Sequence, residues 1–99
     1  MEYFFEWDPK KARENIQKHK VNFQRAATIF RDPSMISVFD DEHSDTEERW
    51  ITAGMDEKGA VQIVSHTFET IDKFQCSIRI ISAPKTAKDE IKQYKVFNP

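Results

Sequence analysis

Three stretches of alternating hydrophobic and polar residues, joined by short turns, constrain the fold of this chain most strongly. They span residues 50–55, 61–68 and 74–83. Alternation places successive side chains on opposite faces of a sheet. Asp56-Glu57-Lys58-Gly59 is a typical hairpin turn between the first two stretches, and 68–73 joins the second to the third. The pattern predicts an antiparallel meander of three strands.

Two helices are predicted before this meander. Asp8 and Pro9 form a strong helix start, because Asp8 can cap free N–H groups and Pro9 lacks an N–H that would need a partner. The first helix is expected from Pro9 to about Lys18 or His19, with Ala12, Ile16 and His19 at helical spacing. Asn22 is the expected cap of a second helix, which ends before Asp32-Pro33. Its apolar face is Phe23, Ala26, Ala27 and Phe30.

The remaining segments complete an α+β domain. YFFEW at the N-terminus and residues 35–39 read as short strands. Residues 86–97 are expected to form a C-terminal helix with Ala87, Ile91 and Tyr94 facing inward. Helices segregated from an antiparallel sheet are typical of the α+β class. We expect one domain over residues 1–99, since a chain of this length supports a single core.

Composition excludes several classes of protein. A hydrophobic content of 38% favours a globular chain over a disordered one. The chain contains no Walker or Rossmann glycine motif. The lone cysteine, Cys76, cannot form an internal disulfide and is compatible with a reducing compartment. The chain has no apolar run of membrane length and no signal-peptide pattern. We therefore expect a soluble, cytoplasmic protein that does not bind membranes.

Charge is distributed unevenly along the chain. Residues 1–34 carry a net charge of +2, residues 35–74 a net charge of −7 and residues 75–99 a net charge of +3. Most such segments are simply solvated surfaces. The alternative is that both charged surfaces bind partners, such as a polyanion on the basic side and a basic protein on the acidic side.

The acidic stretch 40–48 holds six acids and His43. It lacks the central glycine and spacing of a calcium loop. The chain also has no H-x-x-x-H, H-E-x-x-H or C-x-x-C motif for zinc. We therefore expect a polar loop without a metal, and no cofactor. His43 is among acids that favour its protonated form. His66, on a strand, is more typical of a packed residue. The position of His19 is explained by the C-terminal end of a helix, where a cation is favoured.

Arg79 lies in the middle of the third strand of the meander. Phe74, Cys76, Ile78 and Ile80 are predicted to face one way, and Gln75, Ser77, Arg79 and Ile81 the other. Arg79 either forms a salt bridge on the sheet, with the Glu47/Glu48 region as partner, or binds a phosphate through its planar guanidinium. Composition alone favours the salt bridge.

The C-terminal segment carries a row of lysines. Lys88, Lys92 and Lys95 share one helical face, and Lys85 precedes them. Such a row is usually only solvated, but it also suits a single-stranded polyanion. Asp89 and Glu90 interrupt it.

Four phrases occur in order: FEWDPKKARENIQKHKVNF, ATIFRDP, HSDTEERWITAG and RIISAPKTAKDEIKQY. Together they resemble the BrnT family of ribonuclease toxins from bacterial type II toxin–antitoxin systems. The resemblance extends from Phe5 to Tyr94. It implies a RelE-like α+β fold with two N-terminal helices, an antiparallel sheet and a C-terminal helix, together with metal-independent cleavage of RNA that inhibits translation.

The same resemblance implies partners. The neutralising partner would be a BrnA-like ribbon-helix-helix antitoxin, through which the complex would bind operator DNA. The substrate would be RNA, with its own 2′-hydroxyl as the nucleophile. Such a reaction needs a proton acceptor, stabilisation of the phosphorane and a proton donor.

Residues of this chain can be fitted to these roles. Arg79 is expected to stabilise the phosphate with help from Lys85, and His43 and Glu48 are the candidates for proton transfer. Arg49, His66, Lys88 and Lys92 are the expected substrate-binding residues. Tyr94 either supports this site or packs in the core, which is the commoner role.

Two positions depart from the family pattern. Family members usually continue RIISA with an arginine, where this chain has Pro84. They often carry Tyr-Thr-Glu-Arg where this chain has His66-Thr67-Phe68-Glu69. The alternative to an active ribonuclease is therefore a weak or inactive member that acts as an antitoxin-binding module.

Overall fold

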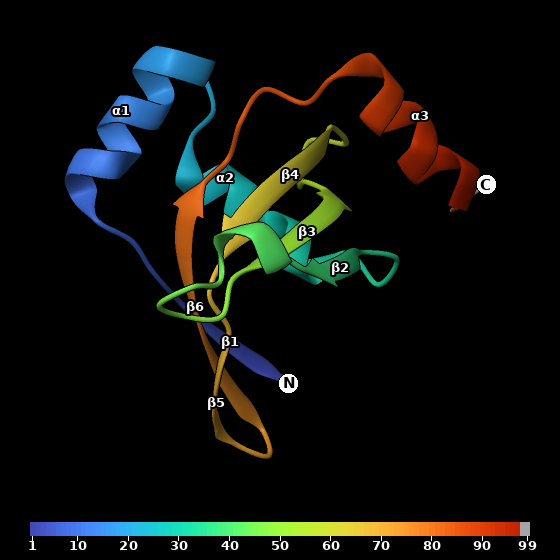
Figure 1. Cartoon of the computed structure of the whole chain (residues 1–99). Helices are drawn as coiled ribbons and strands as arrows, with labels where there is room; N and C mark the ends of the chain where they lie inside the picture. The colour runs from blue at the N-terminus through green and yellow to red at the C-terminus, as the bar shows by residue number, and fades with distance from the viewer. Residues whose placement is uncertain (98–99) are drawn as a thin grey trace.

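The computed structural model describes residues 1–97, so the last two residues of the expected domain lie outside the described part (Figure 1). Three α-helices and six strands occur within it and confirm the α+β class. The N-terminal half holds β1 (Glu2–Glu6), α1 (Pro9–His19), α2 (Phe23–Ala27), the 3-10 turn η1 (Thr28–Arg31), β2 (Ile36–Phe39) and the 3-10 turn η2 (Asp41–His43). The C-terminal half holds β3 (Trp50–Met55), β4 (Val61–His66), β5 (Glu69–Asp72), β6 (Gln75–Ser82) and α3 (Lys88–Phe97).

The strands form one sheet in the order β1-β6-β4-β3-β2, with β5 also paired to β6. The pairs β3–β4 and β4–β6 are antiparallel, as the meander predicts, and β2 adds to it by pairing antiparallel with β3. The N-terminal strand β1 instead pairs with β6 in parallel, from Glu2 opposite Gln75 to Glu6 opposite Arg79. The expectation of a purely antiparallel sheet is therefore wrong at this edge.

The second turn of the meander is also more structured than its sequence predicts. Residues Glu69–Asp72 form β5, which pairs with the first half of β6, while β4 pairs with the second half. The two ladders are joined at Thr67, whose N–H donates to the carbonyl of Arg79 at 3.0 Å. A bend at residues 67–68 thus lets β4 and β5 follow one another along the same edge of β6.

The N-terminal ends of α1 and α2 are capped by the side chains that the sequence predicts. Asp8 accepts a hydrogen bond from the N–H of Lys10 at 2.8 Å, and Pro9 occupies the first turn. Asn22 accepts from the N–H groups of Gln24 and Arg25. These caps satisfy N–H groups that have no partner within a helix.

The buried faces of the helices were predicted correctly only in part. Ile16 is 45% exposed, and the buried residue of α1 is Asn15. The second helix is α-helical only to Ala27 and continues as the 3-10 turn η1. The last helix begins at Lys88, so Ala87 precedes it and is exposed rather than inward.

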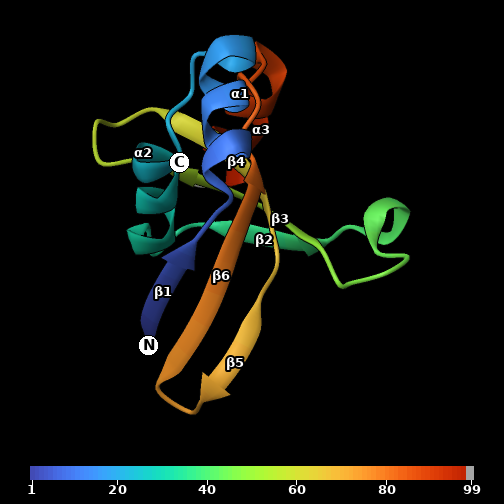
Figure 2. The same ribbon diagram turned by 90° about the vertical axis from the view of Figure 1, so that its left-hand side faces the viewer.

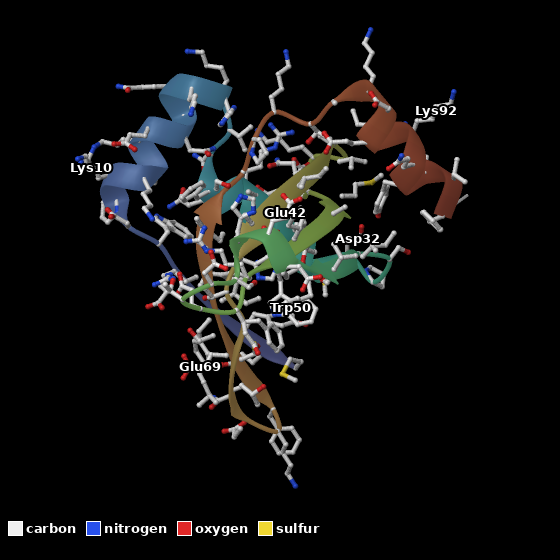
Figure 3. The ribbon with its side chains drawn as sticks, viewed as in Figure 1. Lys10, Asp32, Glu42, Trp50, Glu69 and Lys92 are labelled. Carbon is white, nitrogen blue, oxygen red and sulfur yellow. The ribbon has the colours of Figure 1, made fainter. Side chains whose placement is uncertain are left out.

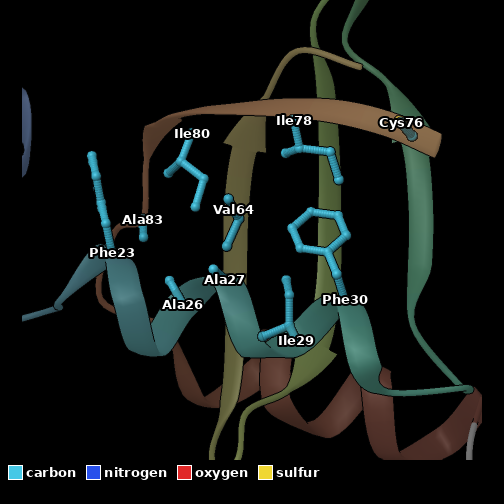
Figure 4. Close-up of a cluster of buried hydrophobic side chains, with 10 residues drawn as sticks. All are labelled: Phe23, Ala26, Ala27, Ile29, Phe30, Val64, Cys76, Ile78, Ile80 and Ala83. Carbon is cyan, nitrogen blue, oxygen red and sulfur yellow. The ribbon is translucent and has the colours of Figure 1, made fainter. Parts of the chain in front are cut away.

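The core lies between the sheet and the α2–η1 segment (Figure 4). Gly54 on β3 allows the close approach, because a Cβ there would lie 3.0 Å from Cβ of Ile29. As predicted, Cys76, Ile78 and Ile80 of β6 face this core. The other members of the buried cluster are Phe23, Ala26, Ala27, Ile29, Phe30, Val64 and Ala83.

Trp50 lies at the margin of this core and is half-buried, with its ring edge-to-face against Phe39 at 5.3 Å. Within residues 1–97, none of the helices combines the length and apolar character that a membrane span needs.

Candidate active site

A polar groove of about 370 Å³ lies on the face of the sheet that α2 does not cover. Its floor comes from β3, β4 and the end of β6, and its wall from the acidic loop. Figure 2 shows α2 on one side of the sheet and the η2 loop on the other. We call this the polar groove, lined by Asp40, Glu42, His43, Arg49, Ile51, Ser65, Ile81 and Ser82.

The acidic loop is held closed by Ser44. Its hydroxyl hydrogen-bonds the carbonyl of Asp40 and accepts from the N–H of Arg49 at 3.0 Å. The N–H of Asp40 donates to the carbonyl of Arg49 at 2.9 Å, just before the β2–β3 ladder begins. The loop is therefore a closed extension of a hairpin, which fixes His43 and Arg49 beside the sheet.

Arg79 is bound by an acid of this loop. Its Nη2 lies 2.6 Å from both carboxylate oxygens of Glu47. Arg49 lies close to the same carboxylate, with Nη2 3.7 Å from Oε1. The side chains of Arg79 and Glu47 are 42% and 37% exposed. The structure thus contains the salt bridge expected for Arg79, at a position that solvent and a substrate can still reach.

Glu47 was not among the proton-transfer candidates that the sequence suggested. Glu48 was, but it is exposed and, within residues 1–97, forms no ion pair with Arg49 or Arg79. The sequence places the partner of Arg79 in the Glu47/Glu48 region but does not say which of the two acids it is. The loop is irregular, so no periodicity indicates which acid points toward Arg79. The useful signal was Arg79 itself, since an arginine in mid-strand needs a neighbouring anion.

His43 is positioned by Asp40. Its Nδ1 lies 2.9 Å from Oδ2 of Asp40. A carboxylate can only accept, so Nδ1 carries the hydrogen in this pair. Nε2 is then the ring nitrogen available for proton exchange, and the side chain is 62% exposed. This is the arrangement in which an acid orients a histidine for proton transfer.

The predicted lysines lie outside the polar groove. Lys85 lines a separate cleft between the β6–α3 linker and the start of α2. Lys88 and Lys92 are exposed on α3, and Figure 3 shows Lys92 on that helix, away from Glu42 at the polar groove. The structure therefore places His43 and Arg49 in one groove and links Arg79 to Arg49 through Glu47, whereas the lysines lie elsewhere.

His66 lies on the opposite face of the sheet and is 2% exposed. Its Nε2 lies 2.7 Å from the hydroxyl of Thr52, and its Nδ1 lies 3.0 Å from the carbonyl of Thr67. Burial lowers the pKa of His66, and the hydrogen bond to Thr67 offsets this only in part. His66 lines an apolar pocket of about 180 Å³ that includes Phe30, Trp50 and Phe68. It is packed there, away from the polar groove.

Tyr94 anchors α3 to the segment before β2. It is buried, and its hydroxyl donates to Oδ2 of Asp32. Burial and the hydrogen bond to Asp32 raise the pKa of Tyr94 to about 12. Burial also acts to raise the pKa of Asp32, but hydrogen bonds from Tyr94, Met55 and Ser34 outweigh it and lower that pKa. These contacts give Tyr94 a structural role, which was the alternative to supporting the site.

The polar groove therefore offers the guanidinium of Arg49 and an oriented imidazole, and the Glu47–Arg79 ion pair adjoins it through Arg49. Guanidinium groups bind and neutralise phosphoryl oxygens, and a carboxylate with an imidazole can accept and donate protons. Within residues 1–97, no three His, Cys, Asp or Glu side chains converge as a set of metal ligands. The fold and this arrangement define a small α+β protein whose polar side chains are of the types that suit a phosphodiester substrate.

The sequence identifies the family within this class. Residues 7–90 match the family model of BrnT, the ribonuclease toxin of type II toxin–antitoxin systems. The chain belongs to this family, as its sequence phrases indicate, and a toxin of this type acts with an antitoxin protein as partner. No curated protein sequence matches the chain.

Proposed function

We propose that this protein is an active endoribonuclease toxin whose catalytic centre is the polar groove together with the adjoining Glu47–Arg79 ion pair. The observation that carries the proposal is the contact of Glu47 with Arg79, beside Arg49 and His43. Family membership supports ribonuclease activity in general. The groove supplies the residue types that metal-independent RNA cleavage requires.

In the proposed reaction, the 2′-oxygen of the RNA attacks the adjacent phosphorus and the bond from phosphorus to the 5′-oxygen breaks. The products are a 2′,3′-cyclic phosphate and a free 5′-hydroxyl. One groove residue takes the proton of the 2′-hydroxyl, and another gives a proton to the 5′-oxygen. Glu47 is the proposed acceptor and His43 the proposed donor.

Arg79 and Arg49 are proposed to stabilise the charge that develops on the phosphorane. In the free protein Glu47 occupies the site on Arg79 that a phosphate would take. Substrate binding therefore exchanges one anion for another on Arg79 and frees Glu47 to act as a base. Glu48, which forms no ion pair with either arginine within residues 1–97, has no role in this scheme.

The wider biological role follows the family. We propose a RelE-like arrangement of the fold, cytoplasmic cleavage of RNA that inhibits translation, and neutralisation by a BrnA-like ribbon-helix-helix antitoxin. Operator DNA would be bound through that antitoxin. The acidic stretch of the middle third of the chain complements a basic segment of such a partner.

One observation favours a second function. The salt bridge of Glu47 neutralises Arg79, and Pro84 stands where family members usually carry an arginine. A protein that keeps this pair closed would bind antitoxin without cutting RNA. It would then act as an interaction module.

Purified protein incubated with RNA in EDTA separates the two functions. An active toxin cleaves RNA in the chelator and leaves 2′,3′-cyclic phosphate ends. Expression in bacteria without the antitoxin arrests growth, and co-expression of the neighbouring ribbon-helix-helix protein restores it. Intact RNA and unimpaired growth would support the interaction module instead.

A further inference from the structure

A second cleft lies on the other side of the β6–α3 linker from the polar groove. Its volume is about 260 Å³. Three cationic side chains from separate elements line it: Lys20 after α1, Arg25 on α2 and Lys85 on the linker. We call this the basic groove, and its other lining residues are Val21, Asn22, Ala60, Val61, Gln62, Thr86 and Ile91.

Lys20 has an unusual backbone conformation for its side chain. It lies at the C-terminal end of α1 with φ of 61°, and no other non-glycine residue within 1–97 has a positive φ. Glycine is the residue that helix ends of this geometry favour. A lysine here accepts a strained backbone, and its side chain lines the basic groove.

Arg25 is fixed rather than mobile. Its Nε donates to Oδ2 of Asp56 at 2.7 Å, and the side chain remains 38% exposed. The Asp56 carboxylate is fully enclosed and also accepts from the N–H groups of Lys58 and Ala60. Arg25 thus has a defined direction, and its outer N–H groups are left for a further acceptor.

Gln62 supports the anchor of Arg25. It is 6% exposed, and its Nε2 donates to Asp56, the carboxylate that fixes Arg25. Its Oε1 is enclosed and so is out of reach of a ligand in the basic groove. The groove therefore presents three cations, which match a ligand with anionic oxygens.

The position of the basic groove connects it with the polar groove. Ser82 lines the polar groove and Lys85 lines the basic groove. Three residues of extended chain span at most about 11 Å, so both grooves are within reach of one short strand of nucleic acid. Figure 3 shows nitrogen-tipped side chains gathered at the end of the molecule that carries α1 and α3, with Glu69 near the opposite end.

We propose that the basic groove binds the phosphodiester backbone of the RNA substrate, next to the phosphate that is cleaved. Lys20, Arg25 and Lys85 hold the backbone oxygens. This inference rests on the proposed ribonuclease function and explains why Lys85 lies outside the polar groove. The groove sets how RNA is held and takes no part in proton transfer.

The test uses a variant that lacks two of the cations. Lys20→Gly suits the backbone at φ of 61° and so is expected to preserve the fold, and Lys85→Ala changes an exposed residue of the linker. The matched control is Lys10→Ala with Lys73→Ala, which removes the same charge from the first turn of α1 and from the β5–β6 turn. All proteins are compared by thermal unfolding first.

Binding is measured by fluorescence anisotropy with a short 2′-O-methyl RNA, which lacks the attacking hydroxyl. The Lys20→Gly/Lys85→Ala protein is expected to bind roughly ten-fold more weakly, with a salt slope smaller by about 1.4, the value for two phosphate contacts on a single strand. The control is expected to bind like wild type.

The outcomes separate this inference from the proposed function. Equal binding by the basic-groove variant and the control would overturn the inference, even if wild type cleaves RNA. Selective loss of binding together with a wild type that never cleaves RNA would support the basic groove and overturn the ribonuclease. If wild type does not bind the RNA at all, the inference is overturned as well.

Discussion

Both carboxylate oxygens of Glu47 lie 2.6 Å from Nη2 of Arg79, although the two residues are 32 positions apart in the chain. The contact joins the acidic loop to the middle of β6 and places two opposite charges beside His43 and Arg49. A half-exposed ion pair of this kind contributes little to stability. We therefore propose that its value lies in the chemistry of the site, and this proposal leads to the first prediction.

Arg79→Ala is expected to slow RNA cleavage by about 10²–10³-fold, because a preorganised cation is lost from the phosphorane. The free energy of unfolding should fall by less than about 1 kcal/mol, since the pair is about 40% exposed. Single-turnover cleavage and urea unfolding measure the two effects. Arg31→Ala, on the exposed surface of η1, is the control. An unfolded Arg79→Ala protein would show that the pair is structural.

His43→Asn removes the proposed proton donor. The rate of cleavage should fall by about 10²–10⁴-fold, because proton transfer to the leaving oxygen is lost. RNA binding and thermal stability should change little, since the side chain is 62% exposed. A substrate with a better leaving group than a 5′-hydroxyl should recover most of the rate. Unchanged cleavage of ordinary RNA would remove His43 from the mechanism.

Protonation of His66 should destabilise the protein in mild acid. Burial holds its pKa below the ordinary value of 6.5, so the unfolded chain takes up this proton first. The contribution of His66 to stability is complete above pH 6.5 and is lost as the pH falls toward the lowered pKa. Urea unfolding from about pH 8 to pH 5 measures it. His66→Gln should flatten this dependence, and an equal slope in both proteins would contradict the assignment.

Tyr94 should produce the opposite dependence in alkali. Its pKa is raised from 10.0 to about 12, so the folded protein holds the phenolic proton more tightly than the unfolded chain does. The stability that this provides is complete below pH 10 and is lost as the pH rises through about 12. Tyr94→Phe should lose about 1–3 kcal/mol at neutral pH, because a hydrogen bond to a charged group is removed, and RNA cleavage should persist. Loss of cleavage without loss of stability would place Tyr94 in the active site.

Asn15 is expected to contribute strongly to the attachment of α1 to the rest of the protein. Its side-chain amide donates to the carbonyls of Val21 and Ala83 and accepts from the N–H of Ala83. Asn15→Ala leaves these buried groups without partners and should lower the free energy of unfolding by at least about 2 kcal/mol. Ile16→Ala, at a position 45% exposed, should lower it by less than about 1 kcal/mol. A larger effect at Ile16 than at Asn15 would reverse this interpretation.

The pattern of Asn15 and Ile16 shows what hydrophobic spacing could and could not predict. Spacing located α1 and its caps, because Asp8, Pro9 and Asn22 act through local backbone geometry. It assigned the wrong inward residue, because the end of β6 presents the polar backbone of Ala83 rather than an apolar surface. An asparagine side chain can hydrogen-bond with this backbone, and an isoleucine side chain cannot.

The sequence also did not reveal which distant segments of the chain pair with one another. The faces of β6 follow from alternation alone, so Cys76, Ile78 and Ile80 were correctly assigned to the core. Nothing local in YFFEW reveals that β1 joins β6 in parallel. In the same way, the sequence indicated that Arg79 needs an anion but not that Glu47 supplies it, since an irregular loop has no fixed period.

The single-turnover rate of RNA cleavage by Glu47→Gln, measured in EDTA, tests the central claim most directly. Glutamine keeps the shape of the side chain and can still contact Arg79, but it is a far weaker base. The polar groove described above predicts a fall of at least about 10²-fold in rate with little change in RNA binding, and Glu48→Gln should cleave at the wild-type rate. A Glu47→Gln protein that cleaves as fast as wild type, or faster because Arg79 is released, would contradict the assignment of Glu47 as the base.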